Sequence, residues 1–278
     1  MLTRRLAVLL LVGLVDCAEG AAEHGSVSEN GLSLNKLSLN KLSLNKLSLN
    51  KLSLDGLDSD GLAGLAASAD GREVLTYVAR CALREGDQLS ARVDGVEMHF
   101  PGLLGLAPEW SERACDLTCQ RWVSACLIAH GNGLGVSVPI SLRGPHPALL
   151  ATDDEQRAYP VQEGAFYGNV FTPTPGGSHT MDVCRGTGLG QILANPASDL
   201  RKRLCGILND CPVDDAGSCG KLGDAQPQCE QTLTDGTYRS CWIAESKTLL
   251  PVGAEPTVGE VTLDDVRYDE VITVYLRK

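Results

Sequence analysis

Residues 115–130 read CDLTCQRWVSACLIAH, and this stretch decides how the compact part of the chain is arranged. Side chains three and four residues apart lie on the same side of an α-helix. The spacing therefore predicts a long helix with one buried side, which we expect to begin at Ser111 and to end at the Gly131-Asn132-Gly133 turn. The residues that recur at these spacings are Cys115, Cys119, Trp122, Cys126 and His130.

This stripe can hold either metal ligands or disulfide cysteines. Its two ends are about 22 Å apart in an α-helix, so one metal ion cannot bind them all. The chain has 11 cysteines, and an even set remains when Cys17 is set aside with the N-terminal signal. An even, dense set predicts a disulfide framework of four or five bridges, in which each cysteine of the stripe pairs with another segment. We predict no metal and no cofactor; the disulfide candidates are Cys81, Cys115, Cys119, Cys126, Cys184, Cys205, Cys211, Cys219, Cys229 and Cys241.

The segments on either side of the stripe predict both helices and strands. The apolar spacing in residues 72–83 is helical, and the two strand-like runs around Asp94-Gly95 predict a β-hairpin with a two-residue turn. The closing stretch Val271–Leu276 is apolar on both faces, which indicates an interior strand. Pro139 lies in an alternating run and favours an edge strand.

The second half of the chain is rich in loops, with a short helix expected over residues 198–208. Together the patterns predict an α+β fold, a disulfide-rich domain of small helices and antiparallel strands over residues 70–278.

A five-residue repeat precedes this domain. Asn-Lys-Leu-Ser-Leu occurs four times without change over residues 35–54, inside a series of related units over residues 30–64. A helix or a flat strand would scatter its leucines, whereas a four-sided coil points the central ones inward. The repeat resembles the pentapeptide-repeat family, which implies a quadrilateral β-helix. The series is short, so it forms either a partial β-helix coil or a disordered tether.

The N-terminus has the features of an export signal. Arg4 and Arg5 precede an uncharged apolar run too short to span a bilayer, so we assign residues 1–20 to a signal peptide and 21–29 to a linker. The stretch ending at Cys17 resembles a bacterial lipoprotein signal, which makes Cys17 a possible lipid attachment site and the only expected membrane contact. We expect an exported protein, extracellular or associated with the outer membrane or cell envelope.

The net charge and the motifs limit the classes of function that fit the sequence. The net charge of −11 disfavours nucleic acid, which proteins recognise through clustered Lys and Arg. No Gly-x-Ser-x-Gly motif occurs, but a hydrolase can assemble a Ser-His-Asp site without it, and His130 or His146 are the candidate bases. Carbohydrate or cell-wall binding is the other alternative, if aromatic residues such as Trp110, Trp242 and Tyr167 are exposed together.

Three stretches carry a wider resemblance: residues 115–144, 163–169 and 184–186. Together they resemble a group of uncharacterised exported bacterial cysteine-rich proteins with leucine-rich five-residue repeats at the N-terminus. The resemblance implies that the protein is exported, but it implies no activity. We therefore expect a non-catalytic envelope or secreted interaction protein, with its disulfide-bonded domain on a repeat stalk and an unknown protein or cell-surface glycan as partner.

Overall fold

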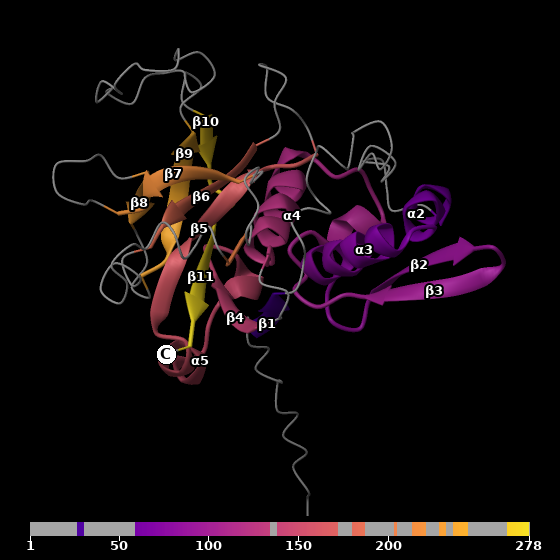
Figure 1. Ribbon diagram of the computed structural model, residues 1–278, viewed down its shortest axis with the longest axis horizontal. Coiled ribbons are helices and arrows are strands. Elements are labelled where there is room, and N and C mark those ends of the chain that lie inside the picture. Colours follow the sequence, from indigo (N-terminus) through magenta and orange to yellow (C-terminus); the bar gives the residue numbers. More distant parts are fainter. Residues whose placement is uncertain are drawn as a thin grey trace, which may run out of the picture.

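The protein has a mixed α+β fold with many strands and few helices, as the sequence predicts. The computed structural model describes residues 27–30, 59–133, 138–171, 180–186, 203–204, 213–220, 228–231, 236–243 and 266–277. The molecule has three parts: the helices with a β-hairpin, which lie to the right of the strands in Figure 1, a six-stranded sheet, and a three-stranded sheet. The site described below lies in the helical layer.

The central sheet has the strand order β1-β4-β11-β5-β6-β7. Its neighbouring strands are antiparallel, except that β6 and β7 run parallel. The interior position of β11, between β4 and β5, confirms the prediction for the closing stretch. In chain order, β1 is Val27–Asn30, β4 is Val138–Arg143, β5 is Val161–Asn169, β6 is Thr180–Arg185, β7 is Asp214–Ser218 and β11 is Ile272–Leu276.

Both faces of the central sheet are covered, because alternate side chains of β5 enter different cores. Phe166 packs with the helices in one hydrophobic cluster, whereas Ala165 and Tyr167 pack in a second cluster with the three-stranded sheet. Successive side chains of a strand point to opposite faces of a sheet. The whole of β5 is therefore buried, and it forms the centre of the molecule.

The three-stranded sheet has the order β10-β9-β8. Two disulfides lie in this part of the molecule: Cys184–Cys219 joins β6 to the end of β7, and Cys229–Cys241 joins β8 to β9. The cluster around them contains tyrosines and cysteines and few aliphatic side chains. The three strands are Cys229–Gln231, Tyr238–Ile243 and Val266–Tyr268, which are β8, β9 and β10.

The helical layer has α4 (Leu117–Ala129) at its centre. This helix packs on β5 and on α3 (Ala69–Ala82), and nearly all of its residues are buried. It begins later than predicted, because Asp116 is its cap, whereas Ser111 ends the short 3-10 helix Pro108–Ser111. Because α4 is buried on nearly all sides, cysteines and apolar residues occupy more than one of its faces.

A β-hairpin lies beside α3 and α2 (Ser59–Ala66), and its turn confirms the prediction. Strand β2 is Gln88–Val93 and β3 is Val96–Pro101. Asp94 and Gly95 both have positive φ, at 50° and 82°. A tight two-residue turn of this handedness needs that conformation at both positions, which Asp and Gly adopt with little strain.

Pro139 does not lie in an edge strand, because β1 pairs on the outer side of β4. Pro139 faces Glu29 of β1, whereas β11 pairs only with residues 141–143 of β4. The proline thus lies where β4 has one hydrogen-bonded neighbour, and its missing N–H leaves no ladder bond open on the β11 side.

Several predictions concern residues outside the described part of the chain. These are the signal peptide with Cys17, the exact repeats over 35–54, Cys205, Cys211 and most of the helix expected over 198–208. Residues 59–64, which belong to the repeat series in the sequence, form most of α2. No helix in the described ranges is both long enough and apolar enough to cross a membrane.

Candidate functional site

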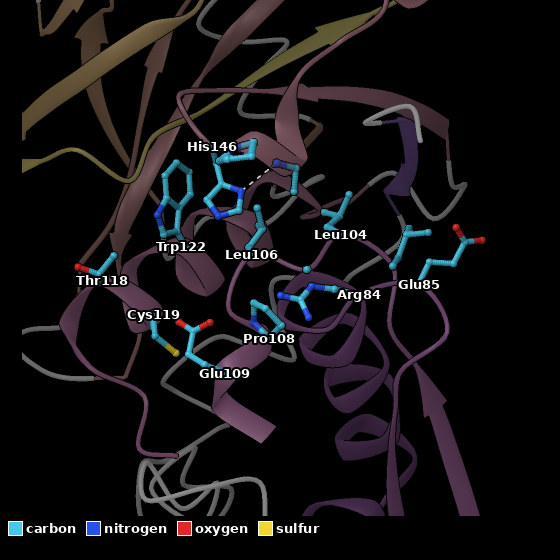
Figure 2. A pocket seen from close by; sticks show the side chains of 14 residues that line it. Arg84, Glu85, Leu104, Leu106, Pro108, Glu109, Thr118, Cys119, Trp122 and His146 are labelled. Carbon is cyan, nitrogen blue, oxygen red and sulfur yellow. Dashed lines mark hydrogen bonds between the residues drawn. The ribbon is translucent and has the colours of Figure 1, made fainter. Parts of the chain in front are cut away.

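A pocket of about 1100 Å³ opens in the helical layer. Four segments form it: the turn after α3 with Arg84 and Glu85, the loop after β3, the first turns of α4, and the segment from His146 to Ala148. Figure 2 shows their side chains around one cavity, with Leu106 between Trp122 and Arg84. Three residues of this lining have a role predicted from the sequence: Cys119 and Trp122 as helix core, and His146 as a candidate base.

The first wall is a loop that hydrogen-bonds to the last turn of α3. The last carbonyl groups of a helix have no partner within the helix. Here the N–H of Leu104 donates to Arg80 O (2.8 Å) and the N–H of Leu106 donates to Cys81 O (3.0 Å). Gly105 lies between them with φ +69°, and a Cβ there would come 2.7 Å from Cγ of Arg84. These bonds hold Leu104 and Leu106 against the cavity.

The second wall is the start of α4. Asp116 caps the helix by accepting a hydrogen bond from the N–H of Cys119 (2.9 Å). The side chain of Gln120 donates to Cys115 O (3.0 Å), and a disulfide joins Cys115 to Cys119. Cys119 and Trp122 therefore enter the pocket from a helix end that is held by a cap, a side chain and a bridge.

The third wall carries His146. Its Nδ1 accepts a hydrogen bond from the N–H of Ala148 (3.1 Å), so the neutral ring carries its proton on Nε2. Burial lowers the pKa of His146, and the carboxylate of Glu109 opposes this in part. The ring meets that of Trp122 edge to face, with centroids 5.0 Å apart. At neutral pH His146 thus offers an uncharged N–H donor next to an indole.

The lining is suited to binding an apolar group with a few polar contacts. Leucines, prolines, an alanine and Trp122 form half of it, and the charged side chains are Arg84, Glu85 and Glu109. Ligand pockets commonly have this composition, an apolar interior with a small number of polar groups that orient the ligand. The lining itself holds two carboxylates and one guanidinium, and the carboxylate of Glu109 is also 4.0 Å from the guanidinium of Arg113, outside the lining.

Neither candidate base is set up as the histidine of a serine hydrolase. That chemistry needs Nδ1–H donating to a carboxylate and a free Nε2 beside the serine hydroxyl. In His146 the roles are reversed, because Nδ1 accepts. In His130, Nδ1 donates to the backbone O of Cys126 (2.8 Å) and the side chain is fully buried. Among the described residues a serine meets a histidine ring at Ser90 and His99 (2.9 Å), on the open surface of the hairpin.

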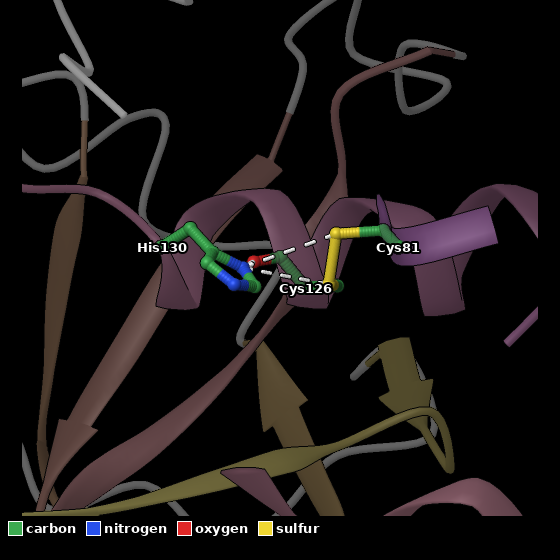
Figure 3. A group of neighbouring side chains, drawn as sticks. All are labelled: Cys81, Cys126 and His130. Carbon is green, nitrogen blue, oxygen red and sulfur yellow. Dashed lines mark hydrogen bonds between the residues drawn. A yellow bond between two sulfur atoms is a disulfide. The ribbon is translucent and has the colours of Figure 1, made fainter. Parts of the chain in front are cut away.

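His130 lies against the disulfide that joins α3 to α4 (Figure 3). Its Nδ1 is 3.5 Å from Sγ of Cys126 and 3.9 Å from Sγ of Cys81. Burial lowers the pKa of His130 to about 4, and the positive charges of Arg80 and Arg203 act in the same direction. The three ligand atoms are close enough for one metal ion, but both sulfurs are bonded to each other.

A second group of sulfurs lies between the two sheets, with Sγ of Cys184 3.2 Å from Sγ of Cys229. Cys184, Cys229 and Cys241 have the spacing of a metal site, but each belongs to a disulfide. A thiolate is the form that binds a metal, and a disulfide sulfur supplies none. Both groups therefore act as bridges in this structure.

The structure brings together eight of the ten predicted cysteines as four disulfides, Cys81–Cys126, Cys115–Cys119, Cys184–Cys219 and Cys229–Cys241. These bridges fit an oxidising environment. One expectation is wrong: Cys115 and Cys119 pair with each other and not with another segment. The reason is local, because the chain leaves the helix axis at Asp116, so the sulfur of Cys115 can reach that of Cys119.

The aromatic residues named for carbohydrate binding do not form an exposed cluster. Trp110 and Tyr167 are fully buried, the former against Phe171 and the latter against Tyr268. Trp242 is partly exposed, near Arg267. The sequence could not distinguish these positions, because an aromatic residue near a turn fits core and surface equally well. It also gave no signal for Arg84 and Glu109, which reach the pocket only through the fold.

Comparison with known proteins gave no match: no protein-family model, no curated protein and no solved structure is similar to this chain.

Proposed function

We propose that the protein is an exported, non-catalytic interaction protein of the cell envelope or the extracellular space, and that its pocket holds a segment of a partner polypeptide. The observation that carries this proposal is the large pocket with an apolar lining and few charges. Pockets of this kind bury an apolar ligand and use a small number of polar groups to orient it. The disulfides support it, since exported domains often depend on such bridges.

The partner segment should combine an apolar side chain with a basic one. Leu104, Leu106 and Trp122 offer an apolar surface, while Glu85 and Glu109 offer carboxylates at the same cavity. The net charge of −11 adds a long-range attraction for cations. An acidic segment would be repelled, and a purely polar segment would leave the apolar lining in water.

Fluorescence anisotropy with labelled synthetic peptides tests this proposal. We expect a peptide of alternating leucine and lysine to bind more tightly than its leucine-glutamate and serine-lysine counterparts. Glu109→Gln should weaken the leucine-lysine peptide about threefold to fivefold at low salt, because a partly exposed charge pair contributes up to about 1 kcal/mol. The weakening should disappear at high salt.

A bulky substitution in the pocket provides the control. Ala148→Trp fills the cavity from the third wall and should abolish binding of the leucine-lysine peptide. Val96→Trp places the same side chain on the exposed hairpin, where Val96 is 59% exposed, and should leave binding unchanged. Equal binding of all three peptides, or full binding by Ala148→Trp, would contradict the proposal.

The competing function is an exported hydrolase with a Ser-His-Asp site. The tautomer of His146 and the burial of His130 count against it. A fluorophosphonate probe labels the activated serine of such an enzyme. We expect no labelled serine; stoichiometric labelling of one serine, lost on mutation of either histidine, would favour the hydrolase.

The placement of the domain is part of the proposal. We infer that a lipid on Cys17 anchors the mature protein to the membrane. Strand β1, which precedes the repeat over residues 35–54, already pairs with β4 of the domain, so residues 18–26 lie between Cys17 and the domain. Intact mass spectrometry of the protein from membranes tests the lipid. A mature chain that starts after Cys17 would remove the anchor but not the pocket.

A further inference from the structure

The bridge Cys115–Cys119 differs from the other three disulfides of the described residues. Its cysteines are 4 residues apart, against 45, 35 and 12 in the others. Cys119 also lines the pocket, whereas no cysteine of the other three bridges does. A short bridge at the wall of a binding cavity can be opened from that cavity.

We propose that the Cys115–Cys119 disulfide exchanges with a cysteine thiol of the polypeptide that the pocket holds. The proposal rests on the proposed function for the docking of that polypeptide, and it goes beyond binding because a covalent bond forms. It also names the partner more closely: an apolar, basic segment with a cysteine, from a protein that acquires or rearranges disulfides outside the cell.

The exchange is balanced in two steps. The thiolate of the partner attacks Sγ of Cys119; a bond forms between these sulfurs, and the bond to Cys115 breaks, so Cys115 leaves as a thiolate that water protonates. A second thiol of the partner then attacks the partner's sulfur in the mixed disulfide and releases Cys119 as a thiolate. The partner loses two electrons and two protons, and Cys115 and Cys119 become a dithiol.

The attack should fall on Cys119 and not on Cys115. Cys119 is among the residues that line the pocket, and Cys115 is not. Both side chains are otherwise buried, so a thiol in bulk solvent has little access. Leu117, which lies between them in the sequence, is 50% exposed and offers an apolar contact beside the bridge. A docked segment therefore reaches a sulfur that small thiols reach slowly.

The first turn of α4 favours a negative charge on Cys119. Cys119 is the third residue of the helix, where N–H groups have no partner within the helix and the helix dipole is positive. Such a position stabilises the Cys119 thiolate that the second step releases, whereas the first step, in which Cys115 leaves, depends on access to Cys119 from the pocket. The carboxylates of Asp116 and Glu109 act against this, because Asp116 caps the same turn and Glu109 lines the same pocket.

The fold should persist when this bridge opens. A disulfide that closes a short loop restricts the unfolded chain least. The start of α4 keeps the Asp116 cap and the hydrogen bond from Gln120 to Cys115 O, and Cys81–Cys126 still ties the helix to α3. Opening Cys115–Cys119 thus leaves the pocket in place for the partner.

Mixed-disulfide formation by Cys115→Ser, which leaves Cys119 as a free thiol, tests the proposal. The probes are the disulfide-linked dimer of a leucine-lysine peptide with one central cysteine, and oxidised glutathione. We expect the peptide to form an adduct at Cys119 about tenfold or more faster than glutathione, because docking raises its effective concentration. Intact mass and peptide mapping follow the adduct.

Two further variants separate exchange from docking. Cys115→Ser combined with Ala148→Trp should lose the preference for the peptide and keep the slow reaction with glutathione. Cys81→Ser, which frees the buried Cys126 in the same helix, should form no adduct while folded. If Cys115→Ser reacts no faster than Cys81→Ser, the exchange is overturned. If it reacts equally fast with both probes, exchange stands but the docked partner is refuted.

The wild-type chain gives a measurement that no folding defect can obscure. In a stepwise titration with a reduced leucine-lysine peptide that carries two cysteines, followed by alkylation, Cys115 and Cys119 should be modified first, while the circular dichroism of the protein stays native. Modification of Cys115 and Cys119 only together with loss of the native spectrum would overturn the proposal.

Discussion

The helical layer and the three-stranded sheet cover opposite faces of one central sheet, but different interactions stabilise them. On the helical side, α3, α4 and the hairpin bury a large cluster of aliphatic and aromatic side chains. On the other side the cluster is small, and four of its ten core members are cysteines. Hydrophobic burial therefore stabilises one face of the central sheet, whereas disulfides contribute much of the stability on the other face.

This difference follows from how much apolar surface each segment can bury. Burial of apolar surface contributes roughly 25 cal/mol per Å², so α3 and α4 can stabilise their layer through side chains such as Leu75 and Leu127. The short strands β8 and β10 contribute few such side chains. Two disulfides restrict the unfolded chain there in place of a larger core.

Removing one long-range bridge from each region should test the comparison most strongly. Cys184→Ala/Cys219→Ala and Cys81→Ala/Cys126→Ala remove bridges across 35 and 45 residues. Chain entropy predicts a similar loss for both, about 4 kcal/mol of unfolding free energy. For Cys184→Ala/Cys219→Ala we expect hydrogen exchange to show a local loss of protection in β8 and β9. For Cys81→Ala/Cys126→Ala we expect a small, even decrease in protection over the whole domain, with α3 and α4 still protected. Identical exchange patterns would contradict the comparison.

A buried ion pair also stabilises the helical side, and its removal is the second test of the comparison. Arg203 bonds to Glu163 of β5 and to the carbonyl group of Gly131 after α4. Glu163→Gln should lower the unfolding free energy by about 3–5 kcal/mol, because it leaves a buried guanidinium without its counter-charge. Urea unfolding measures this loss.

The control for that substitution is an exposed ion pair on the hairpin. Arg92 and Glu97 are 3.5 Å apart with side chains 70% and 51% exposed. Glu97→Gln should change stability by about 0–1 kcal/mol, since solvent screens such a pair. A loss at Glu163 as small as at Glu97 would show that the buried pair does not anchor the helix end.

Acid should weaken the helical side through His130. Its pKa is lowered from 6.5 to about 4, so the unfolded chain binds a proton there that the folded chain does not. The contribution is fully present above pH 6.5 and is lost as pH falls toward 4, by up to about 3 kcal/mol. Urea unfolding as a function of pH measures it.

His130→Gln isolates this contribution, because glutamine does not titrate. The variant should show a flatter pH dependence than the wild type between pH 6.5 and 4. Glu270 gives a small opposite trend in both chains, since burial raises its pKa and favours the protonated form. Parallel curves for the two chains would show that His130 is not the group responsible.

Much of the secondary structure could be predicted, because its causes are local. The turn Asp94-Gly95 requires positive φ at both positions, and the alternation around it is that of a hairpin. The closing strand β11 is apolar on both faces because packed layers cover both faces of the central sheet. The start of α4 was placed wrongly because Ser111 and Asp116 are both good caps, and only packing chooses between them.

The candidate site could be predicted only in part. The spacing of Cys119 and Trp122 placed them on one helix, but their function as pocket lining depends on Leu106 and His146, which lie in other segments. The burial of Trp110 and Tyr167 likewise depends on neighbours such as Phe171 and Tyr268. No periodicity in one segment carries information about such contacts.

The sequence by itself determined the properties that arise within a few residues: the helix periods, the hairpin turn, the α+β class and an even set of cysteines suited to bridges. Tertiary structure alone decided which cysteines pair, which nitrogen of His146 holds its proton, and where four segments leave a pocket. The physical reason is distance along the chain. Local patterns reflect backbone geometry and capping, whereas bridges, tautomers and cavities depend on atoms that only packing brings together.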